Sequence, residues 1–228
     1  MVKKVFTMQI HLLGYSEATL SRIFDVLADS NQGYEIIIVQ NMPVAETIKF
    51  CPPGMSFKKI SCEQWQFDAA TGRCFPAVMN PQPKKQLFDF FQERCGVQKS
   101  QYCNLIHPRA VVSSTAALDT GCMVEPGAVV CSFAQLGFGV YVNRGSTIGH
   151  HVRIGEYSMT GPGVHIAGHC DIGEGVKLGI GAVVFDHVRI GDHTIVGGGS
   201  VVTKDLPAGV IAWGNPCKVI KSISLHEA

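Results

Sequence analysis

The sequence predicts a left-handed parallel β-helix preceded by a small α/β, Rossmann-like domain. Three observations lead to this fold class: an unbroken six-residue repeat over residues 107–202, an aliphatic residue at the sixth position of almost every repeat, and a strand–helix–strand pattern before residue 103. A repeat of fixed length indicates units that bury their apolar side only by stacking on one another. We therefore expect two domains, residues 1–103 and residues 104–228, the second with a C-terminal tail.

The repeat divides into sixteen consecutive frames without a gap: HPRAVV SSTAAL DTGCMV EPGAVV CSFAQL GFGVYV NRGSTI GHHVRI GEYSMT GPGVHI AGHCDI GEGVKL GIGAVV FDHVRI GDHTIV GGGSVV. The sixth residue is Val, Leu or Ile in every frame except the one that ends in Thr160, and the fourth residue is always small or Val. This pattern fits a short strand that faces a narrow interior, whereas a helix would need apolar residues three and four positions apart.

Three such strands close a triangular coil of 18 residues, and successive coils stack about 4.8 Å apart. Sixteen frames give just over five coils, which form a prism roughly 25 Å long. The hexapeptide pattern is that of a left-handed coil, an exception to the right-handed rule for parallel crossovers. A generic β-rich solenoid of unknown hand is the alternative.

The first hundred residues alternate between apolar runs and helical periodicity. Such alternation indicates a small open domain with a parallel sheet. The expected strands are residues 5–14, 34–41 and 73–81, and the expected helices are residues 16–30 and 83–96, the second closed by Gly96.

Composition excludes several classes of partner. The chain has 19 basic and 18 acidic residues with no run of either sign, which argues against a nucleic-acid or anionic membrane surface. Nine cysteines without zinc-site spacing indicate reduced thiols. We find no signal peptide and no apolar window of about 18 residues, so we expect a cytoplasmic protein without a membrane span.

From "NLIHPRAVV" to "GNPCKVI", the chain resembles the bacterial sugar O- and N-acyltransferases of the hexapeptide superfamily. The nearest groups are the sialic acid O-acetyltransferase-like proteins and the N-acetyltransferases of UDP-linked 4-amino sugars. The resemblance implies a homotrimer that binds acetyl-CoA along the groove between two prisms, without a metal. The implied activity is acetylation of an amino or hydroxyl group on a sugar, either free or nucleotide-linked, in surface-polysaccharide synthesis.

The resemblance implies that His150, in the segment "VNRGSTIGHHVRIGE", is the general base. An amine or hydroxyl that attacks a thioester must lose a proton, and a positioned imidazole is the usual acceptor. Relatives commonly carry Asp or Glu next in sequence, where this chain has His151, which cannot increase the basicity of its neighbour. Asp186, two coils away, is at about 10 Å and too far to replace that acid directly. The alternative that an acidic residue of an adjacent subunit supports His150 stays open.

A zinc site is the competing hypothesis. His151, His169 and His187 are spaced by 18 residues and should stack on one edge of three coils. Gamma-class carbonic anhydrases bind zinc with three histidines on the same fold, but zinc needs all three nitrogens at about 2.0–2.1 Å. A straight ladder places its outer members nearly 10 Å apart at the backbone, so we favour a solvated ladder. A non-catalytic scaffold is the third hypothesis.

Frames beyond the histidines are rich in glycine, as in "GIGAVV" and "GGGSVV". Glycine leaves backbone N–H and C=O groups open to the amides of a pantetheine arm. Lysines can meet the phosphates of the nucleotide end as point charges. The resemblance places acyl-CoA contacts at Met159, Gly168, Ile180 and Gly198, and the candidate phosphate contacts are Lys204 and Lys218.

The substrate end matches its relatives less well. Of their glycine-rich phosphate loop only Gly14 is present, in "LLGYSEATL", and Glu17 in the following helical turn complements the helix dipole and would repel a phosphate. Gln40 and Asn41 stand where relatives place an acidic pair. Nucleotide-sugar binding by this domain is thereby weakened, and Asn143, which matches a position beside the acceptor, is the better substrate contact.

Overall fold

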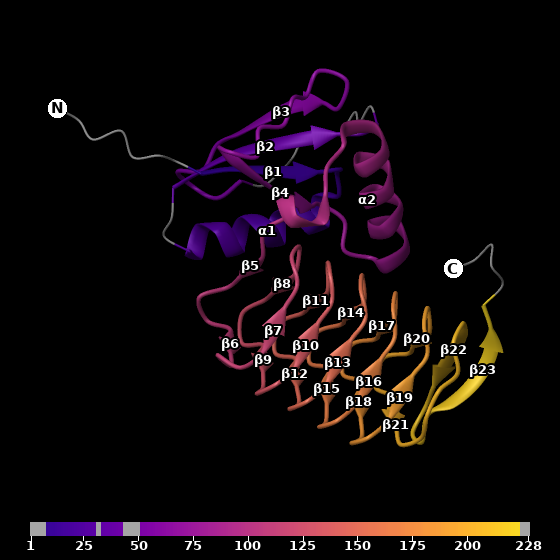
Figure 1. The fold of residues 1–228 in the computed structure, drawn as a ribbon. Helices are drawn as coiled ribbons and strands as arrows, with labels where there is room; N and C mark the ends of the chain where they lie inside the picture. Colours follow the sequence, from indigo (N-terminus) through magenta and orange to yellow (C-terminus); the bar gives the residue numbers. More distant parts are fainter. Residues whose placement is uncertain (1–7, 31–32, 43–50, 224–228) are drawn as a thin grey trace.

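A computed structural model describes residues 8–30, 33–42 and 51–223. The chain forms an α/β domain that sits on one face of a β-helical prism (Figure 1). No helix in these described ranges is long and apolar enough to cross a membrane.

The N-terminal domain has a four-stranded parallel sheet in the order β3-β2-β1-β4. Its core includes apolar residues of β1, β2 and α1, as the two apolar runs and the helical spacing predict. The elements are β1 (Met8–Leu13), α1 (Glu17–Asp29), β2 (Tyr34–Gln40), β3 (Phe57–Ser61), β4 (Gly72–Pro76) and α2 (Pro81–Cys95), followed by the short 3-10 helix η1 (Lys99–Gln101).

Two features of this domain differ from the sequence prediction. Strand β3 was not predicted, because an edge strand of sequence FKKIS is largely exposed and charged and gives little apolar signal. The predicted third strand ends earlier, at Pro76, because the helix already begins at Pro81, where proline suits the first turn. The predicted end of α2 at Gly96 is confirmed, with φ at 71° in the left-handed region. Residues 5–7 of the predicted first strand lie outside the described residues.

The prism has three faces, and each is a sheet of parallel strands built from every third strand of the repeat. The last strand of the first sheet, β23, is the exception and runs antiparallel to β22. The first face, which carries the N-terminal domain, consists of β5 (Leu105–Ile106), β8 (Met123–Val124), β11 (Tyr141–Val142), β14 (Met159–Thr160), β17 (Lys177–Leu178), β20 (Ile195–Val196), β22 (Val210–Trp213) and β23 (Lys218–Ser222). The second face consists of β6 (Val111–Val112), β9 (Val129–Val130), β12 (Thr147–Ile148), β15 (His165–Ile166), β18 (Val183–Val184) and β21 (Val201–Val202). The third face consists of β7 (Ala117–Leu118), β10 (Gln135–Leu136), β13 (Arg153–Ile154), β16 (Asp171–Ile172) and β19 (Arg189–Ile190).

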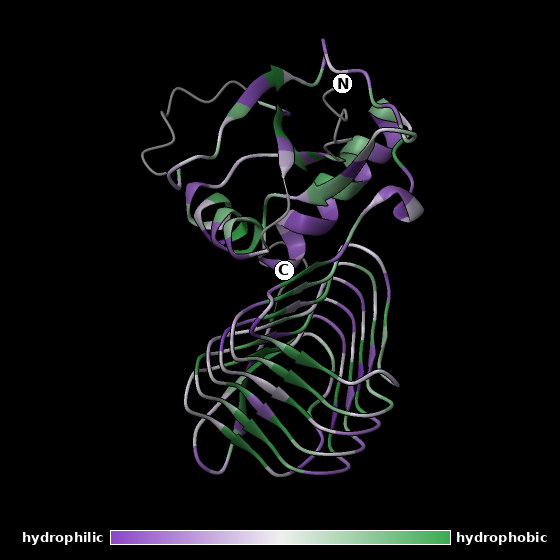
Figure 2. Cartoon of the chain, turned by 90° about the vertical axis from the view of Figure 1, so that its left-hand side faces the viewer, coloured by the Kyte–Doolittle hydropathy of each residue, from purple (hydrophilic) through white to green (hydrophobic). Residues whose placement is uncertain are grey.

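Strands pair with a register of 18 residues, as when Thr147 pairs with His165. Side chains from the fourth and sixth positions of the frames fill the interior, and Figure 2 shows green apolar residues following the strands around the coils. Thr160, the exception in the pattern, is buried because its hydroxyl has partners: it accepts the Asn143 backbone N–H at 2.9 Å and lies 3.2 Å from the Ser146 hydroxyl.

The third position of the frame adopts positive φ from Gly121 onwards. Glycine occupies many of these positions because it tolerates the left-handed region without strain. Histidine is among the residues that enter this region more readily than β-branched ones. The stacked histidines at 151, 169 and 187 all have φ between 57° and 61°, so each occupies the same corner position of its coil.

We name the three edges of the prism by their residues. The histidine edge joins the second and third faces, at residues 131–133, 149–151, 167–169, 185–187 and 203–205. The glycine edge joins the first and second faces, at residues 125–127, 143–145, 161–163, 179–181 and 197–199. The aromatic edge joins the third and first faces, at residues 119–121, 137–139, 155–157, 173–175 and 191–193.

The N-terminal domain packs on the first face and the aromatic edge. Tyr141 and Met123 join the core of α1, and Phe138 and Tyr157 join the core of α2. The buried Lys84 of α2 donates from Nζ to the carbonyl of Gly139 at 2.6 Å. The histidine edge therefore lies opposite the domain.

Candidate active site

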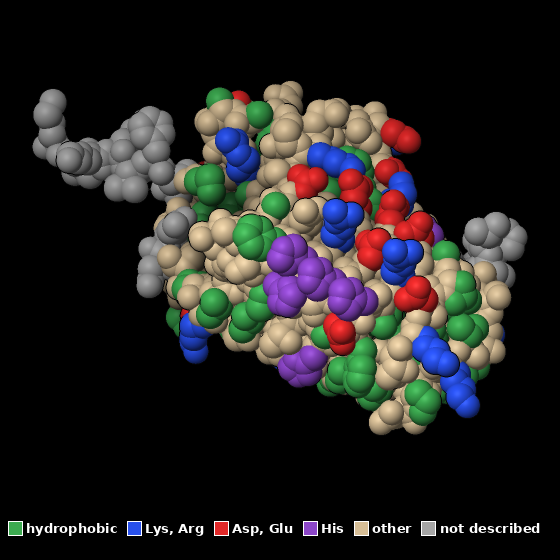
Figure 3. Space-filling model, turned by 60° about the horizontal axis from the view of Figure 1, so that its bottom comes forward, with side chains coloured by type: hydrophobic (Ala, Val, Ile, Leu, Met, Phe, Trp, Pro, Cys, Tyr) green, Lys and Arg blue, Asp and Glu red, His purple; other side chains and the backbone are tan. Residues whose placement is uncertain are grey.

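Imidazoles gather on the histidine edge, on the side of the prism that turns away from the N-terminal domain (Figure 3). His150 and His151 are consecutive in the turn after β12, and both are exposed. Their Nδ1 atoms lie 3.1 Å apart. One of the two rings must therefore carry its proton on Nδ1 and donate it to the other.

The ring of His150 lies over the backbone of the next coil. A Cβ atom added to Gly168 would be 2.8 Å from both Cε1 and Nε2 of His150. The ring of His169 meets that of His150 edge-on, with 4.9 Å between centroids. The coil above thus determines where the imidazole of His150 can lie.

The stacked histidines form the ladder that their spacing predicts. Ring centroids of His151, His169 and His187 are 4.9 Å apart at each step, and both pairs stack face to face. The pKa of His169 is lowered, first by loss of hydration and then by the neighbouring imidazoles, while Asp186 acts in the opposite direction. Asp186 thus acts on His169, and the hydrogen-bond partner that the structure gives the His150 ring is His151.

The predicted acyl-CoA contacts lie on two edges and one face. Gly168 is on the histidine edge beside His150, and Lys204 is exposed on the same edge, three coils along. Ile180 and Gly198 are on the glycine edge, where the Ile180 side chain is 65% exposed. A single chain therefore presents Gly168 and Lys204 on one edge, and Ile180 and Gly198 on another.

The remaining two predicted contacts are elsewhere. Met159 is half-buried on β14 and packs against the core of the N-terminal domain, far from a position beside His150 on its own chain. Lys218 is exposed on β23, at the C-terminal end of the first face.

Gly14 has a packing role in the N-terminal domain. Its φ is +85°, its N–H donates to the carbonyl of Val39 at 2.8 Å, and a Cβ there would be 2.8 Å from Leu87 of α2. Glu17 is in the first turn of α1, as predicted.

Asn143 and His150 occupy consecutive corners of one coil, separated by β12. The Asn143 residue is 2% exposed, and its Oδ1 accepts the Arg144 backbone N–H at 2.9 Å. The predicted substrate contact is therefore brought into a buried polar network and not to the side of its own chain's His150.

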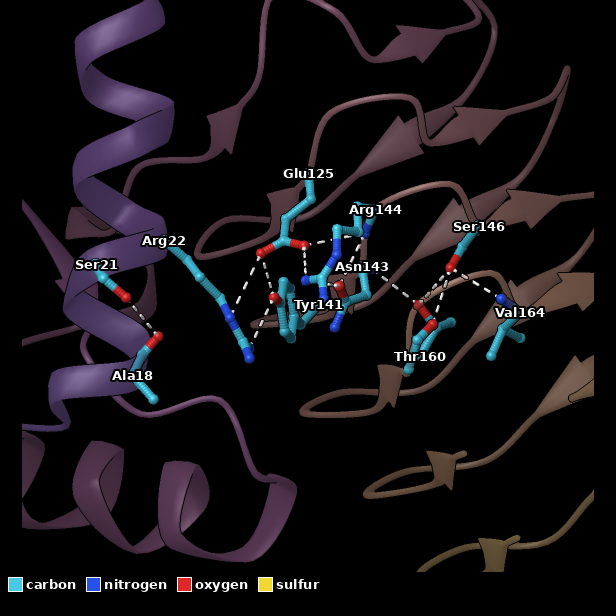
Figure 4. A network of polar contacts seen from close by, with 11 residues as sticks. Ala18, Ser21, Arg22, Glu125, Tyr141, Asn143, Arg144, Ser146, Thr160 and Val164 are labelled. Atoms are coloured by element: carbon cyan, nitrogen blue, oxygen red, sulfur yellow. Dashed lines mark hydrogen bonds and ion pairs between the residues drawn. The ribbon is translucent and has the colours of Figure 1, made fainter. Parts of the chain in front are cut away.

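This network joins the glycine edge to α1 and was not predicted from the sequence (Figure 4). The buried carboxylate of Glu125 accepts the Tyr141 hydroxyl at 2.5 Å and the Arg144 backbone N–H at 3.0 Å. Arg22 of α1 reaches Tyr141 Oη at 3.3 Å, and burial raises the pKa of Tyr141. In the sequence, the only sign of this network that we identify is the acidic residue Glu125 at the first position of the frame "EPGAVV".

Two surface hollows of the described chain lie away from His150, His151 and His169. One cavity of about 430 Å³ lies between the start of α2 and the aromatic edge, and its lining includes Asn80, Tyr157 and Lys177. A second of about 540 Å³ lies beside it, around Lys99 and Glu156. Neither of these two hollows encloses His150 or His151.

Comparison with known proteins extends these observations. A family model described as "Bacterial transferase hexapeptide (six repeats)" matches residues 169–204. A search of curated proteins finds no match.

Among solved structures, the acetyltransferase domain of PglB from Neisseria gonorrhoeae, in complex with acetyl coenzyme A, is 24% identical with a TM-score of 0.80, covering 94% of this chain and 100% of that one. PerB from Caulobacter crescentus, in complex with CoA and GDP-perosamine, is 26% identical with a TM-score of 0.74, covering 94% and 97%. WeeI from Acinetobacter baumannii is 20% identical with a TM-score of 0.75, covering 94% and 100%. The predicted left-handed β-helix with its preceding α/β domain is confirmed.

Proposed function

This chain has the repeat and the fold of the hexapeptide-repeat sugar acyltransferases, and we propose that it transfers the acetyl group of acetyl-CoA to an amino or hydroxyl group of a sugar. A nucleotide-linked amino sugar is the first candidate acceptor. The observation that carries the proposal is the match to PerB over 94% of the chain at 26% identity, because that structure holds CoA and GDP-perosamine together. Synthesis of surface polysaccharide is the process that we propose for it.

His150 is the proposed proton acceptor. The acceptor nitrogen or oxygen attacks the thioester carbonyl, its proton passes to the imidazole, and the C–S bond breaks to release the CoA thiolate, which takes up a proton. No group of the enzyme is acylated in this scheme. An exposed ring held over Gly168 suits the role, because proton transfer needs a positioned imidazole within reach of the acceptor.

The glycine edge suits an extended amide-containing ligand. The third-position residues Gly145, Gly163, Gly181 and Gly199 have positive φ, and a Cβ at any of them would meet nothing within 4 Å. A ligand chain can therefore approach this backbone closely. We propose that Ile180 and Gly198 contact the pantetheine arm here, with Gly168, Met159, Lys204 and Lys218 as further candidate contacts.

We propose that the enzyme is a homotrimer with sites shared between chains. The N-terminal domain covers the first face, so a sugar held by it is across the prism from the same chain's His150. The glycine edge that would hold the donor is also a different edge from the one that carries His150. A neighbour that brings its glycine edge and its domain to this histidine edge would supply the missing wall, and cyclic symmetry repeats that contact around the ring.

Acceptor screening tests the activity. Acetyl-CoA is incubated with UDP-, GDP- and dTDP-linked amino sugars and with the free sugars, and thiol release and the acetylated product are followed by absorbance and mass spectrometry. We expect one nucleotide-linked amino sugar to be acetylated and the His150→Ala variant to be nearly inactive with it. A chain that binds acetyl-CoA and acetylates nothing in the panel would contradict the proposed acceptor class, and one that fails to bind acetyl-CoA would favour a scaffold.

A further inference from the structure

Three imidazoles on the histidine edge lie close enough to share one ion. His150, His151 and His169 each offer a ring nitrogen, and these three nitrogens all lie within 4.8 Å of one another. This set differs from the straight ladder of His151, His169 and His187, because it takes two residues from one turn and one from the turn above. It thereby avoids the wide separation at the ends of a ladder.

The spacing of the first two nitrogens is close to that of a tetrahedral site. With metal–nitrogen bonds of about 2.0–2.1 Å, two ligands of a tetrahedral zinc ion lie about 3.3 Å apart. The Nδ1 atoms of His150 and His151 are 3.1 Å apart. The third nitrogen must move inward. His169 is an exposed side chain on a corner, and its ring turns toward the pair by giving up its stacking on His187.

We propose that His150, His151 and His169 form a binding site for a divalent cation of the zinc type, and that the bound ion blocks acetyl transfer by taking the lone pair with which His150 accepts a proton. Imidazole nitrogens favour zinc, copper and nickel over magnesium or calcium, which prefer oxygen. Three protein ligands leave a fourth position for water. All three residues are exposed on the single chain, so no element of that chain has to move for the ion to reach them.

The blocking follows from the chemistry of a neutral imidazole. Such a ring has one nitrogen that carries a proton and one nitrogen with a free lone pair. If the lone pair of His150 binds the ion, the other nitrogen is already protonated, and the ring cannot accept the proton of the acceptor. This second part of the proposal rests on the proposed role of His150, whereas the site itself does not.

Binding is tested by titrating the full-length protein with ZnCl₂ in a calorimeter, and with CoCl₂ by visible absorption, which reports tetrahedral nitrogen ligation. We expect one ion per chain and loss of more than about tenfold in affinity for His151→Ala and for His169→Ala, since even groups outside the ligand shell contribute about 10–100-fold. His193→Ala is the matched control: His193 also has positive φ at the third position of its frame, but lies on the aromatic edge.

Two results would overturn the site. The first is an unchanged zinc affinity in His169→Ala. The second is a loss of zinc affinity in His187→Ala as large as that in His169→Ala, which would indicate the straight ladder instead. Folding of each variant is checked by circular dichroism, and exposed corner substitutions should leave it intact.

Inhibition is tested on the wild-type enzyme with its identified acceptor. We expect initial rates to fall as zinc rises, half-inhibition near the dissociation constant measured by calorimetry, and full recovery with EDTA. Full turnover at saturating zinc would overturn the blocking step while leaving the site. One-site binding in a protein that acetylates no acceptor would leave the site standing and count against the proposed function alone.

Discussion

The ring of His150 lies where a side chain at Gly168 would be: a Cβ there would be 2.8 Å from Cε1 and from Nε2 of the imidazole. The two residues occupy the same position of successive coils on the histidine edge. Any larger residue at 168 must displace the ring, because the far end of a side chain moves more easily than the backbone of a coil.

Gly168→Ala is therefore expected to lower kcat by about tenfold or more, as misplacing a catalytic group by about 1 Å can cost about 100-fold. The variant should fold normally, since the φ of Gly168 is not in the left-handed region and the contact is with a mobile ring. Steady-state kinetics and thermal melting measure the two effects. Wild-type kcat in a folded variant would show that the position of the ring does not matter.

His150→Ala removes the proposed base. We expect turnover to fall by roughly 10²–10⁴, the usual contribution of general acid–base catalysis, while acetyl-CoA binding measured by calorimetry persists. Near-normal turnover in this variant would exclude His150 from the mechanism.

His151→Glu supplies the acidic neighbour that this chain lacks. A carboxylate close to the His150 ring, whose Nδ1 is now 3.1 Å from that of His151, favours the protonated imidazole. The acid limb of the kcat/KM profile should therefore move to higher pH than in wild type. His151→Gln, of the same length without the charge, is the control, and equal profiles for Glu and Gln would show that the charge has no effect.

A shared active site predicts complementation between two inactive variants. His150→Ala damages the histidine edge and Gly198→Trp the glycine edge, and the two variants are co-expressed with different tags so that mixed trimers form. If each site takes these edges from two chains, about a quarter of the sites in random trimers are intact and activity returns to that fraction. Light scattering confirms the trimer. Mixed trimers without activity would place both edges of a site on one chain, and an active monomer would contradict shared sites.

Lys84 predicts a pH-dependent stability. Burial lowers its pKa to about 7, so between pH 7 and pH 10 the folded chain holds it neutral while the unfolded chain binds the proton. The free energy of unfolding of wild type should therefore rise with pH relative to Lys84→Met, by roughly 1.4 kcal/mol per pH unit at most. Urea denaturation at pH 7, 8 and 9 measures this difference.

The control for this prediction is Lys85→Met, which removes an exposed lysine paired with Asp89 on the same helix. It should keep the wild-type pH dependence. If the free energies of unfolding of wild type and Lys84→Met differ by the same amount at all three pH values, Lys84 is charged in the folded chain.

Local sequence was sufficient for the prism because each hexapeptide encodes its own piece of it. Residues such as Ile148 and Val184 were assigned to the interior by position in the frame alone, and both are fully buried. The short strand β3 was missed because an exposed edge strand carries no such pattern. The Glu125 network was missed because its partner Arg22 is about a hundred residues away and no local rule connects them.

The sequence by itself determined the repeat, the coil of 18 residues and the ladder of histidines. These features depend on residues that are neighbours in the chain or are separated by a fixed multiple of the six-residue repeat. The tertiary structure decided which face carries the N-terminal domain, and thus that His150 is on the opposite edge. It also decided that His150 pairs with His151 and lies against Gly168 and His169, and that Gly198 is on another edge. Those relations depend on side-chain rotamers and on packing between distant segments, which a periodic pattern does not specify.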